Sequence, residues 1–340
     1  NNFFNMQKKI KIAVDAMGGE NSPKKVIDGI LENYKENKDV VYNIFGDLEK
    51  IEILLPKDYN KDVFNITNTK NKILDTDTPL SAAKKGKDTS MWLTIKSLKD
   101  NESDVAISAG NTGALFVISK LNLSMIENID KPALAALWPN KKNFNIVLDL
   151  GANIECNEKN LIDFSIMGSS LFKSLFPTYQ AVVALLNIGS EELKGNDIIK
   201  KAYQNLQNNK NENFSFHGYV EGNQIMDGNV NVVVTDGFTG NIALKTAEGT
   251  ANFIINEFKS SMTSNFFGKI SSLINFKNLK KVKRKLDPRL YNGAILIGLN
   301  SPVVKSHGST DYVGFSHSLN VCIKIIKNSL IQKIKDNISK

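Results

Sequence analysis

Two side chains in this 340-residue sequence are suited to stabilise negative charge during a reaction: the ammonium group of Lys194 and the carboxamide of Asn241. We expect Ser190 to cap a helix that holds Lys194 near its start, close to a bound anion. Asn241 is expected to begin a helix over 242–257, where its amide could donate to a developing oxyanion. A solvated surface lysine and a plain helix cap are the alternative interpretations of these two residues.

Five loops rich in Gly, Asn, Ser and Asp are further candidates, because each follows an apolar run typical of a strand. They span residues 15–19, 108–113, 149–153, 187–189 and 235–241. A glycine between a strand and a helix lets backbone N–H groups approach an anion, and the helix N-terminus adds its positive dipole end. None of the loops is a Walker A sequence or a G-x-G-x-x-G fingerprint, so neither ATP nor a dinucleotide is indicated. The loops predict a site for a small phosphate or a phosphate-bearing ligand.

The candidate phosphate-binding residues come from these loops, from the segment after Lys194 and from one loop late in the chain. They are Asp15, Gly18, Gly19, Ser108, Gly110, Asn111, Thr112, Asn153, Gly195, Asn196, Thr239, Gly240 and His307. The three histidines and two cysteines are scattered and give no zinc pattern.

Six runs rich in Val and Ile are predicted to be strands, and the stretches between them have helical period. The runs are 11–15, 40–45, 104–108, 145–150, 181–187 and 230–235. Strands that are apolar on both faces and separated by helices indicate a doubly wound α/β architecture with a mostly parallel sheet. The functional crevice of such a sheet lies at the carboxyl ends of its strands, so we expect the five loops to converge on one rim.

Composition excludes several classes of protein. With 41% hydrophobic and 23% charged residues the chain is too apolar to be disordered, and no apolar run approaches the roughly 18 residues that span a bilayer. Residues 1–9 lack the apolar core of a signal peptide, so we expect an N-terminal extension there and a single α/β domain over 10–340. Cys156 and Cys322 cannot form a disulfide framework, which indicates a reducing, cytoplasmic setting.

Eight segments, in order between about residues 10 and 320, together resemble the PlsX family, the phosphate acyltransferases of bacterial phospholipid synthesis. They are Asp15 to Gly19, Lys87 to Met91, Ser108 to Ala114, Asp149 to Asn153, Met167 to Ser169, Leu193 to Asn196, Asp236 to Gly249 and Lys305 to Gly308. Glu20 and Thr89 depart from the family pattern but conserve its chemistry. The pair His317-Ser318 also departs from it, and we assign no function to His317.

The resemblance implies transfer of a fatty acyl group from acyl carrier protein to inorganic phosphate, which gives acyl-phosphate for glycerolipid synthesis. It also implies a three-layer Rossmann-like fold similar to phosphotransacetylases and isocitrate-dehydrogenase-like enzymes, a homodimer, and no metal or organic cofactor. Loose attachment to the inner membrane face is implied as well, with a membrane glycerol-3-phosphate acyltransferase as the partner that uses the product. The family's proposed catalytic lysine and asparagine fall on Lys194 and Asn241.

The residue chemistry suits that reaction. Phosphate is already a nucleophile at neutral pH, so it can attack a thioester without a covalent enzyme intermediate. Lys194 would offset charge on the phosphate or the tetrahedral intermediate, and Asn241 would donate to the oxyanion. The alternatives are a phosphotransacetylase-like transferase that uses coenzyme A thioesters and a non-catalytic membrane-binding scaffold.

Residues 253–285 hold eight basic residues and one acidic residue, which is +7 of the net charge of +8. This concentration argues against a broad nucleic-acid-binding surface. Apolar residues at helical spacing accompany the cations and predict an inserted, protruding amphipathic helical segment on an anionic bilayer. The residues expected to make the contact are Phe266, Phe267, Ile270, Lys280, Lys281 and Arg284. Contact with acyl carrier protein and a core-facing helix pair with a solvated basic end are the alternatives.

Two further residues can be mistaken for catalytic groups. His307 and Asp311 are four positions apart, whereas the glycerol-phosphate acyltransferase pattern separates them by five, so we interpret His307 as a loop residue near the site. Cys156 has no histidine identifiable as its base, and we interpret it as an ordinary packed cysteine.

Overall fold

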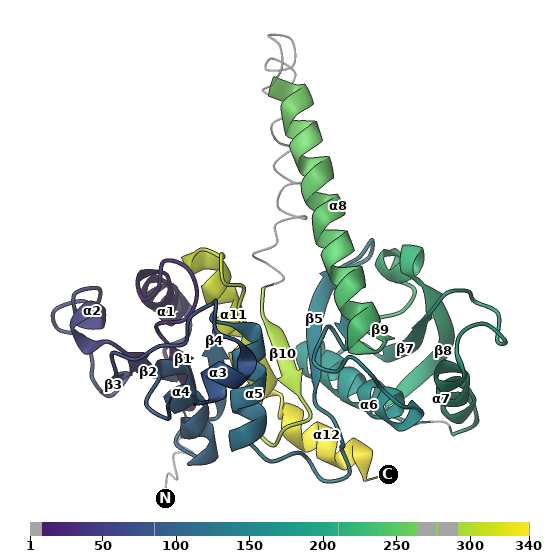
Figure 1. Ribbon diagram of the computed structural model, residues 1–340, viewed down its shortest axis with the longest axis horizontal. Helices are drawn as coiled ribbons and strands as arrows, with labels where there is room; N and C mark the ends of the chain where they lie inside the picture. Colours follow the sequence, from purple (N-terminus) through teal and green to yellow (C-terminus); the bar gives the residue numbers. More distant parts are fainter. Residues whose placement is uncertain (1–8, 85, 210, 264–276, 278–291, 340) are drawn as a thin grey trace, which may run out of the picture.

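The computed structural model describes residues 9–84, 86–209, 211–263, 277 and 292–339. Their strands form one 11-stranded sheet in the order β3-β2-β1-β4-β11-β10-β5-β6-β9-β7-β8 (Figure 1). The strands are β1 (Ile10–Asp15), β2 (Val40–Gly46), β3 (Phe64–Asn68), β4 (Val105–Ser108), β5 (Ala133–Pro139), β6 (Phe144–Leu148), β7 (Ala181–Asn187), β8 (Phe214–Glu221), β9 (Val232–Val234), β10 (Ala294–Ile297) and β11 (Val303–Lys305).

The sheet consists of two parallel halves joined by an antiparallel centre. Neighbouring strands from β3 to β11 pair in parallel, as do those from β6 to β8. The three pairs between these halves, β11 with β10, β10 with β5 and β5 with β6, are antiparallel. The predicted mostly parallel sheet is confirmed, and its antiparallel centre was not predicted.

Helices cover both faces of the sheet, as a doubly wound fold requires. They are α1 (Lys24–Glu36), α2 (Leu48–Glu52), α3 (Pro79–Lys84), α4 (Ser90–Lys99), α5 (Thr112–Asn122), α6 (Glu158–Leu175), α7 (Asp197–Asn208), the 3₁₀ helix η1 (Gly222–Asp227), α8 (Gly237–Thr263), α11 (Tyr312–Lys327) and α12 (Leu330–Ile338).

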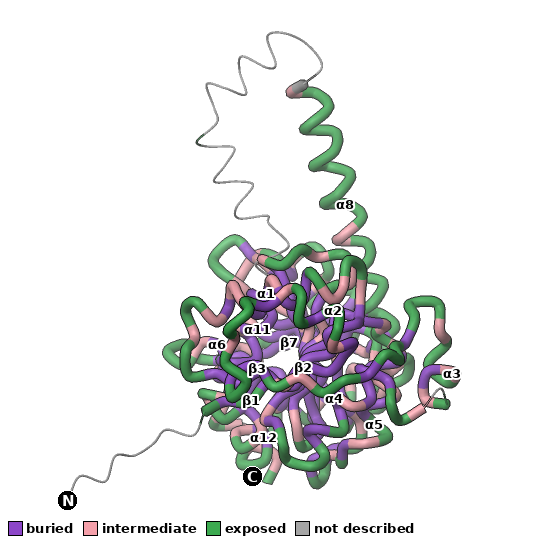
Figure 2. Tube along the Cα trace, turned by 90° about the vertical axis from the view of Figure 1, so that its left-hand side faces the viewer, coloured by how far each residue is buried: buried purple, intermediate pink, exposed green. Residues whose placement is uncertain are grey.

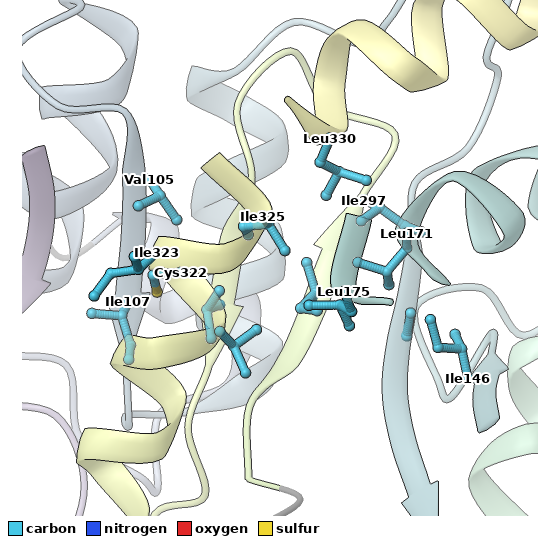
Figure 3. Packing of buried hydrophobic residues seen from close by; sticks show 14 of the residues in the cluster. Val105, Ile107, Ile146, Leu171, Leu175, Ile297, Cys322, Ile323, Ile325 and Leu330 are labelled. Carbon is cyan, nitrogen blue, oxygen red and sulfur yellow. The ribbon is translucent and has the colours of Figure 1, made fainter. Parts of the chain in front are cut away.

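Alternation along the buried strands explains the layers. Ile12 and Val14 of β1 join the cluster that contains the apolar residues of α1, α6, α11 and α12, whereas Ala13 joins the cluster of α4 and α5. Side chains at successive strand positions point to opposite faces, so a strand that is apolar throughout needs cover on both sides. Figure 3 shows the first cluster at the sheet centre, where Ile323 of α11 lies beside Ile107 of β4. That cluster includes residues of both parallel halves of the sheet. The assignment of residues 10–340 to a single domain stays a prediction.

Helix α8 starts on the sheet and then leaves the body of the molecule (Figures 1 and 2). Ala243, Leu244 and Ala247 pack against a cluster on β6, β7 and β9. Farther along, Phe253 and Phe258 are 66% and 56% exposed, so the core-facing alternative is wrong for this part of the segment. No described helix is both long and apolar enough to cross a membrane. The predicted contact residues Phe266, Phe267, Ile270, Lys280, Lys281 and Arg284 lie outside the described residues.

Candidate functional site

The loops after β1 and β4 are bound to one another at the carboxyl ends of the two adjacent strands. The Ser108 hydroxyl donates to Oδ2 of Asp15 at 2.7 Å, and the Met17 N–H donates to Oδ1 at 3.2 Å. Burial raises the pKa of Asp15, and these bonds, with one from the Ser90 side chain, act against the rise. Asp15 and Ser108 therefore hold the two loops in register.

Glycines allow the two loop backbones to touch. A Cβ on Gly18 would lie 2.7 Å from the Gly110 nitrogen, and a Cβ on Gly19 would lie 2.8 Å from the Ala109 carbonyl oxygen. Gly19 also has φ +83°, which L side chains rarely adopt. Three of the predicted residues thus make a close backbone contact that larger residues would prevent.

Asn111 caps the helix that follows this contact. Its Oδ1 accepts from the Ala114 N–H at 3.0 Å, and its Nδ2 donates to the carbonyl oxygen of Asp77 at 2.8 Å. Thr112 is the first residue of α5. The first N–H groups of a helix have no intrahelical acceptor, so this helix start can receive an anion.

Two lysines that sequence reasoning did not assign to the site lie beside these loops. Lys25 of α1 is buried and donates to the Gly308 carbonyl oxygen at 2.5 Å. Lys305, the last residue of β11, donates to the Ala109 carbonyl oxygen at 3.4 Å. Burial, and then Lys25, lowers the pKa of Lys305 to about 8. The only signal in the sequence was the position of Lys305 in the segment Lys305 to Gly308.

His307 lies in the loop after β11, as predicted. Its N–H donates to Oδ1 of Asn292 at 2.8 Å, and Nδ2 of Asn292 donates to the Ser306 hydroxyl at 3.0 Å. Burial, followed by Lys305, lowers the pKa of the His307 imidazole. The buried Asn292, which sequence reasoning missed, therefore positions the loop that carries Lys305 and His307.

Asp149 organises the second group of loops. Its carboxylate accepts from five donors: the N–H groups of Leu134, Gly151, Ala152 and Asn153, and Nδ2 of Asn153. Burial raises the pKa of Asp149, and its hydrogen bonds act against the rise. Asn153 Nδ2 also donates to the Pro132 carbonyl oxygen at 2.6 Å. The side chain of Asn153 is thus used to fix the loop after β6.

Helix α8 begins at Gly237, so the expectation that Asn241 begins this helix is wrong. Asp236 starts the helix because its Oδ1 accepts from the Thr239 N–H at 2.8 Å and its Oδ2 accepts from the Thr239 hydroxyl at 2.9 Å. Gly240 packs on Asp149 so closely that a Cβ would overlap the Asp149 carbonyl oxygen. Thr239 and Gly240 are therefore residues of a helical first turn, held against the loop after β6.

Asn241 lies over the same loop. Its Nδ2 donates to the Leu150 carbonyl oxygen at 3.2 Å and would stand 3.0 Å from a Cβ on Gly151. A carboxamide has two N–H bonds, so one remains after the bond to Leu150. Asn241 is an exposed residue, although the bond from its amide to Leu150 is partly buried.

Lys194 occupies an exposed loop between β7 and α7, and the predicted cap at Ser190 is wrong. The cap is Asn196, whose Oδ1 accepts from the Ile199 N–H at 2.9 Å, so the helix begins at Asp197. Gly195 has φ +94°, and a Cβ there would lie 2.6 Å from Oδ1 of Asn187. Because β7 and β9 are parallel neighbours, the Lys194 loop and the start of α8 follow carboxyl ends at the same edge.

A pocket of about 140 Å³ joins the two groups of loops. Thr112 and Gly113 line it from the start of α5, Gly151 and Ala152 from the loop after β6, and Lys305 from the end of β11. The rest of the wall is apolar and comes from α5, β5, β10 and β11: Leu115, Phe116, Leu134, Leu296 and Val303. The predicted convergence of loops is thus observed for those after β4 and β6, together with Lys305, which was not predicted.

Cys156 is not suited to act as a nucleophile. Burial, and then the charge of Asp149, raises the pKa of its thiol to about 11. A thiol with such a pKa is almost wholly protonated near neutral pH, and the thiolate is the reactive form. This agrees with the interpretation of Cys156 as a packed residue.

Similarity to known proteins extends over almost the whole chain. The family model described as "Fatty acid synthesis protein" matches residues 10–333. A phosphate acyltransferase of Pelagibacter ubique is 67% identical over 333 residues, which cover 98% of this chain and 100% of that protein. A phosphate acyltransferase of Paramagnetospirillum magneticum is 40% identical and is matched over 94% of its length and 97% of this chain.

Solved structures agree on the fold. The EutD phosphotransacetylase from Staphylococcus aureus has a TM-score of 0.60 at 15% identity and is covered over 94% of its chain and 96% of this one. A phosphotransacetylase from Streptococcus pyogenes also has a TM-score of 0.60 at 15% identity, with 95% and 97% covered. At this identity the likeness concerns the fold alone. The family match and the two relatives show that the chain belongs to the PlsX family of fatty acid synthesis proteins, whose members are phosphate acyltransferases.

Proposed function

We propose that this chain transfers a fatty acyl group from acyl carrier protein to inorganic phosphate, giving acyl-phosphate for phospholipid synthesis. The observation that carries the proposal is the position of the Asn241 amide over Gly151, which lines a pocket that also contains Lys305 and the start of α5. The Asn241 amide thus lies against Gly151, one residue of the pocket wall, and Lys305 forms another part of that wall. Names and identities of the relatives support transfer of an acyl group to phosphate.

The reaction needs no protein nucleophile. A phosphate oxygen attacks the thioester carbonyl carbon, the carbonyl oxygen becomes an oxyanion, and the C–S bond then breaks as the thiol of the carrier departs. The free N–H of Asn241 donates to the oxyanion, where a preorganised donor is worth about 3 kcal/mol. Lys194 offsets negative charge on the phosphate or on the tetrahedral intermediate from the neighbouring loop.

We propose that most of the assigned phosphate-binding residues act by shaping the loops. Side chains of this kind, whose polar atoms already bond to neighbouring backbone or side-chain groups, are Asp15, Ser108, Asn111, Asn153 and Asn196. Glycines that permit close backbone contact or a positive φ are Gly18, Gly19, Gly110, Gly195 and Gly240. Thr112 faces the pocket directly.

The projecting part of α8 is proposed to contact the cytoplasmic face of the inner membrane. Its exposed side chains include Phe253, Ile254, Ile255 and Phe258. A helix with exposed aromatic and aliphatic side chains next to a strongly basic sequence suits an anionic bilayer surface. We also propose a homodimer, and a membrane glycerol-3-phosphate acyltransferase as the consumer of the product.

A donor comparison tests the proposed reaction. Purified protein is given either the long-chain acyl thioester of acyl carrier protein or the matching acyl-coenzyme A, with and without phosphate. Both acyl-phosphate and released thiol are measured. We expect phosphate-dependent product from the carrier thioester at a rate well above that from coenzyme A. Equal or faster use of coenzyme A would support the phosphotransacetylase-like alternative, and thiol release in neither case would support the scaffold.

A further inference from the structure

Lys25 and Lys305 lie close to one another, and Lys25 is buried whereas Lys305 is half-buried. Lys25 is only 5% exposed, and its ammonium group donates to the carbonyl oxygen of Gly308. The ammonium group of Lys305 donates to the carbonyl oxygens of Ala109 and Ser306. Among the residues that the structure describes, no carboxylate lies within salt-bridge distance of either lysine. Cations that are partly or wholly withdrawn from water and donate only to neutral carbonyl groups cost free energy, and a bound anion would offset that cost.

The contact between Gly19 and Ala109 brings the two ammonium groups together. A Cβ on Gly19 would lie 3.0 Å from Nζ of Lys25 and 2.8 Å from the Ala109 carbonyl oxygen, the oxygen that accepts from Lys305. Each ammonium group has three N–H donors, so donors remain for a ligand. Lys305 and the start of α5 both line the pocket, and the backbone N–H groups of Thr112 and Gly113 there have no intrahelical acceptor.

We propose that Lys305, with Lys25 beside it, is the cationic centre that binds a phosphate group in this pocket. Phosphate oxygens would accept from Nζ of Lys305 and from the first N–H groups of α5. The choice of inorganic phosphate as the ligand rests on the proposed function. The phosphate of a pantetheine arm has the same chemistry and is the other source of such a group.

The charges around Lys305 give the site a pH dependence. Lys25, Asp75 and Asp15 act on its ammonium group, and His307 lies within reach of its charge. With the pKa of Lys305 at about 8, the lysine loses its positive charge as the pH rises through that value. The His307 pKa is lowered, so its imidazole is already neutral there. Phosphate affinity should therefore fall between about pH 7.5 and about pH 9.5, a range in which phosphate is mainly the dianion.

Calorimetric titration with inorganic phosphate tests the site without any acyl donor. The full-length protein is compared with Lys305→Gln, Lys305→Arg and the matched charge control Lys120→Gln, at constant ionic strength and with chloride as the ion control. Lys120 is exposed at the opposite end of α5. We expect Lys305→Gln to weaken binding about tenfold or more, and Lys120→Gln to leave it unchanged. Lys305→Arg should bind phosphate with a flatter pH profile, because arginine stays protonated.

Each outcome decides the proposal. Three results would overturn it. They are a wild-type protein that fails to bind phosphate, a Lys305→Gln variant that binds phosphate as the wild type does, and a wild-type affinity for phosphate that does not fall at high pH. Competition by 4′-phosphopantetheine, with only weak binding of inorganic phosphate, would assign the site to the arm of the carrier and overturn the choice of ligand. Lys305-dependent phosphate binding in a protein that forms no acyl-phosphate would uphold the site and reject the proposed reaction.

Discussion

The amide nitrogen of Asn241 stands 3.0 Å from the place that a Cβ would take on Gly151, while it donates to the carbonyl oxygen of Leu150 at 3.2 Å. A side chain at Gly151 would therefore displace the proposed oxyanion donor. Gly151 also has φ +128°, a conformation that L side chains rarely adopt. The loop after β6 and the start of α8 thus fit together only with glycine at this position.

Gly151→Ala should lower the rate of acyl transfer by about tenfold or more, because it moves the Asn241 amide. It should also lower the free energy of unfolding by about 1–3 kcal/mol through backbone strain. Steady-state kinetics and denaturant titration measure the two effects. Gly249→Ala is the control: nothing lies within 4 Å of its Cβ position, so activity should stay unchanged and stability should rise by about 0.5–1 kcal/mol. Full activity in Gly151→Ala would show that the amide position is unimportant.

Asn241→Ala should reduce kcat by about 100-fold and leave the KM for phosphate nearly unchanged. The lost N–H is proposed to act on the oxyanion, which exists only after phosphate has bound. Asn208→Ala, an exposed amide at the end of α7, should behave as the wild type. A large rise in the KM for phosphate with unchanged kcat would instead place Asn241 in ground-state binding.

Lys194→Ala should also reduce kcat/KM strongly, by about 10–100-fold, because a charge-assisted contact to phosphate or to the intermediate is removed. Lys201→Ala, an exposed lysine of α7, is the matched control and should retain full activity. Activity is measured at several salt concentrations to separate a specific contact from general attraction. Equal activity of the two variants would identify Lys194 as a solvated surface lysine.

Replacing Phe253 and Phe258 together with serine should weaken binding to anionic vesicles. Both side chains are exposed on the projecting part of α8, and each contributes apolar area that a bilayer interface can bury. Vesicle co-sedimentation with and without anionic lipid measures the effect, and activity with soluble substrates should not change. Ile53→Ser removes a side chain that is 81% exposed on another surface and serves as the control. Unchanged vesicle binding of the double variant would contradict the assigned contact.

The sequence pattern predicted the buried parallel strands well. β1, β2, β4, β6, β7 and β9 lie within two residues of the expected ranges, because their runs are apolar on both faces. The apolar run that holds β10 was also of strand size, whereas β8, an edge strand with exposed positions, and the short β11 gave no comparable signal. The place of β11 depends on its pairing with β4, which lies about 200 residues earlier in the chain.

The sequence predicted the positions of the loops of the site, but not the contacts between them. Glycine and asparagine after strands marked the loops, yet two helix starts were misplaced because Asp236 and Asn196 provide the caps. Lys25 bonds to Gly308, which is 283 residues away, so no spacing could have paired the two. Asp149 accepts from five donors, four of them in residues 151–153 of its own loop and one, Leu134, 15 positions away.

The most direct test of the account is a search for an acylated enzyme. The protein is mixed, without phosphate, with acyl carrier protein that carries a long-chain acyl thioester. One sample is quenched and the mass of the intact protein is measured by mass spectrometry. Phosphate is added to the rest of the mixture, and acyl-phosphate and the protein mass are then measured. Direct attack by bound phosphate predicts an unmodified protein at every time, with acyl-phosphate and free carrier thiol formed only after phosphate is added. A protein that gains the mass of one acyl chain before phosphate is added, and loses it afterwards, would contradict the account.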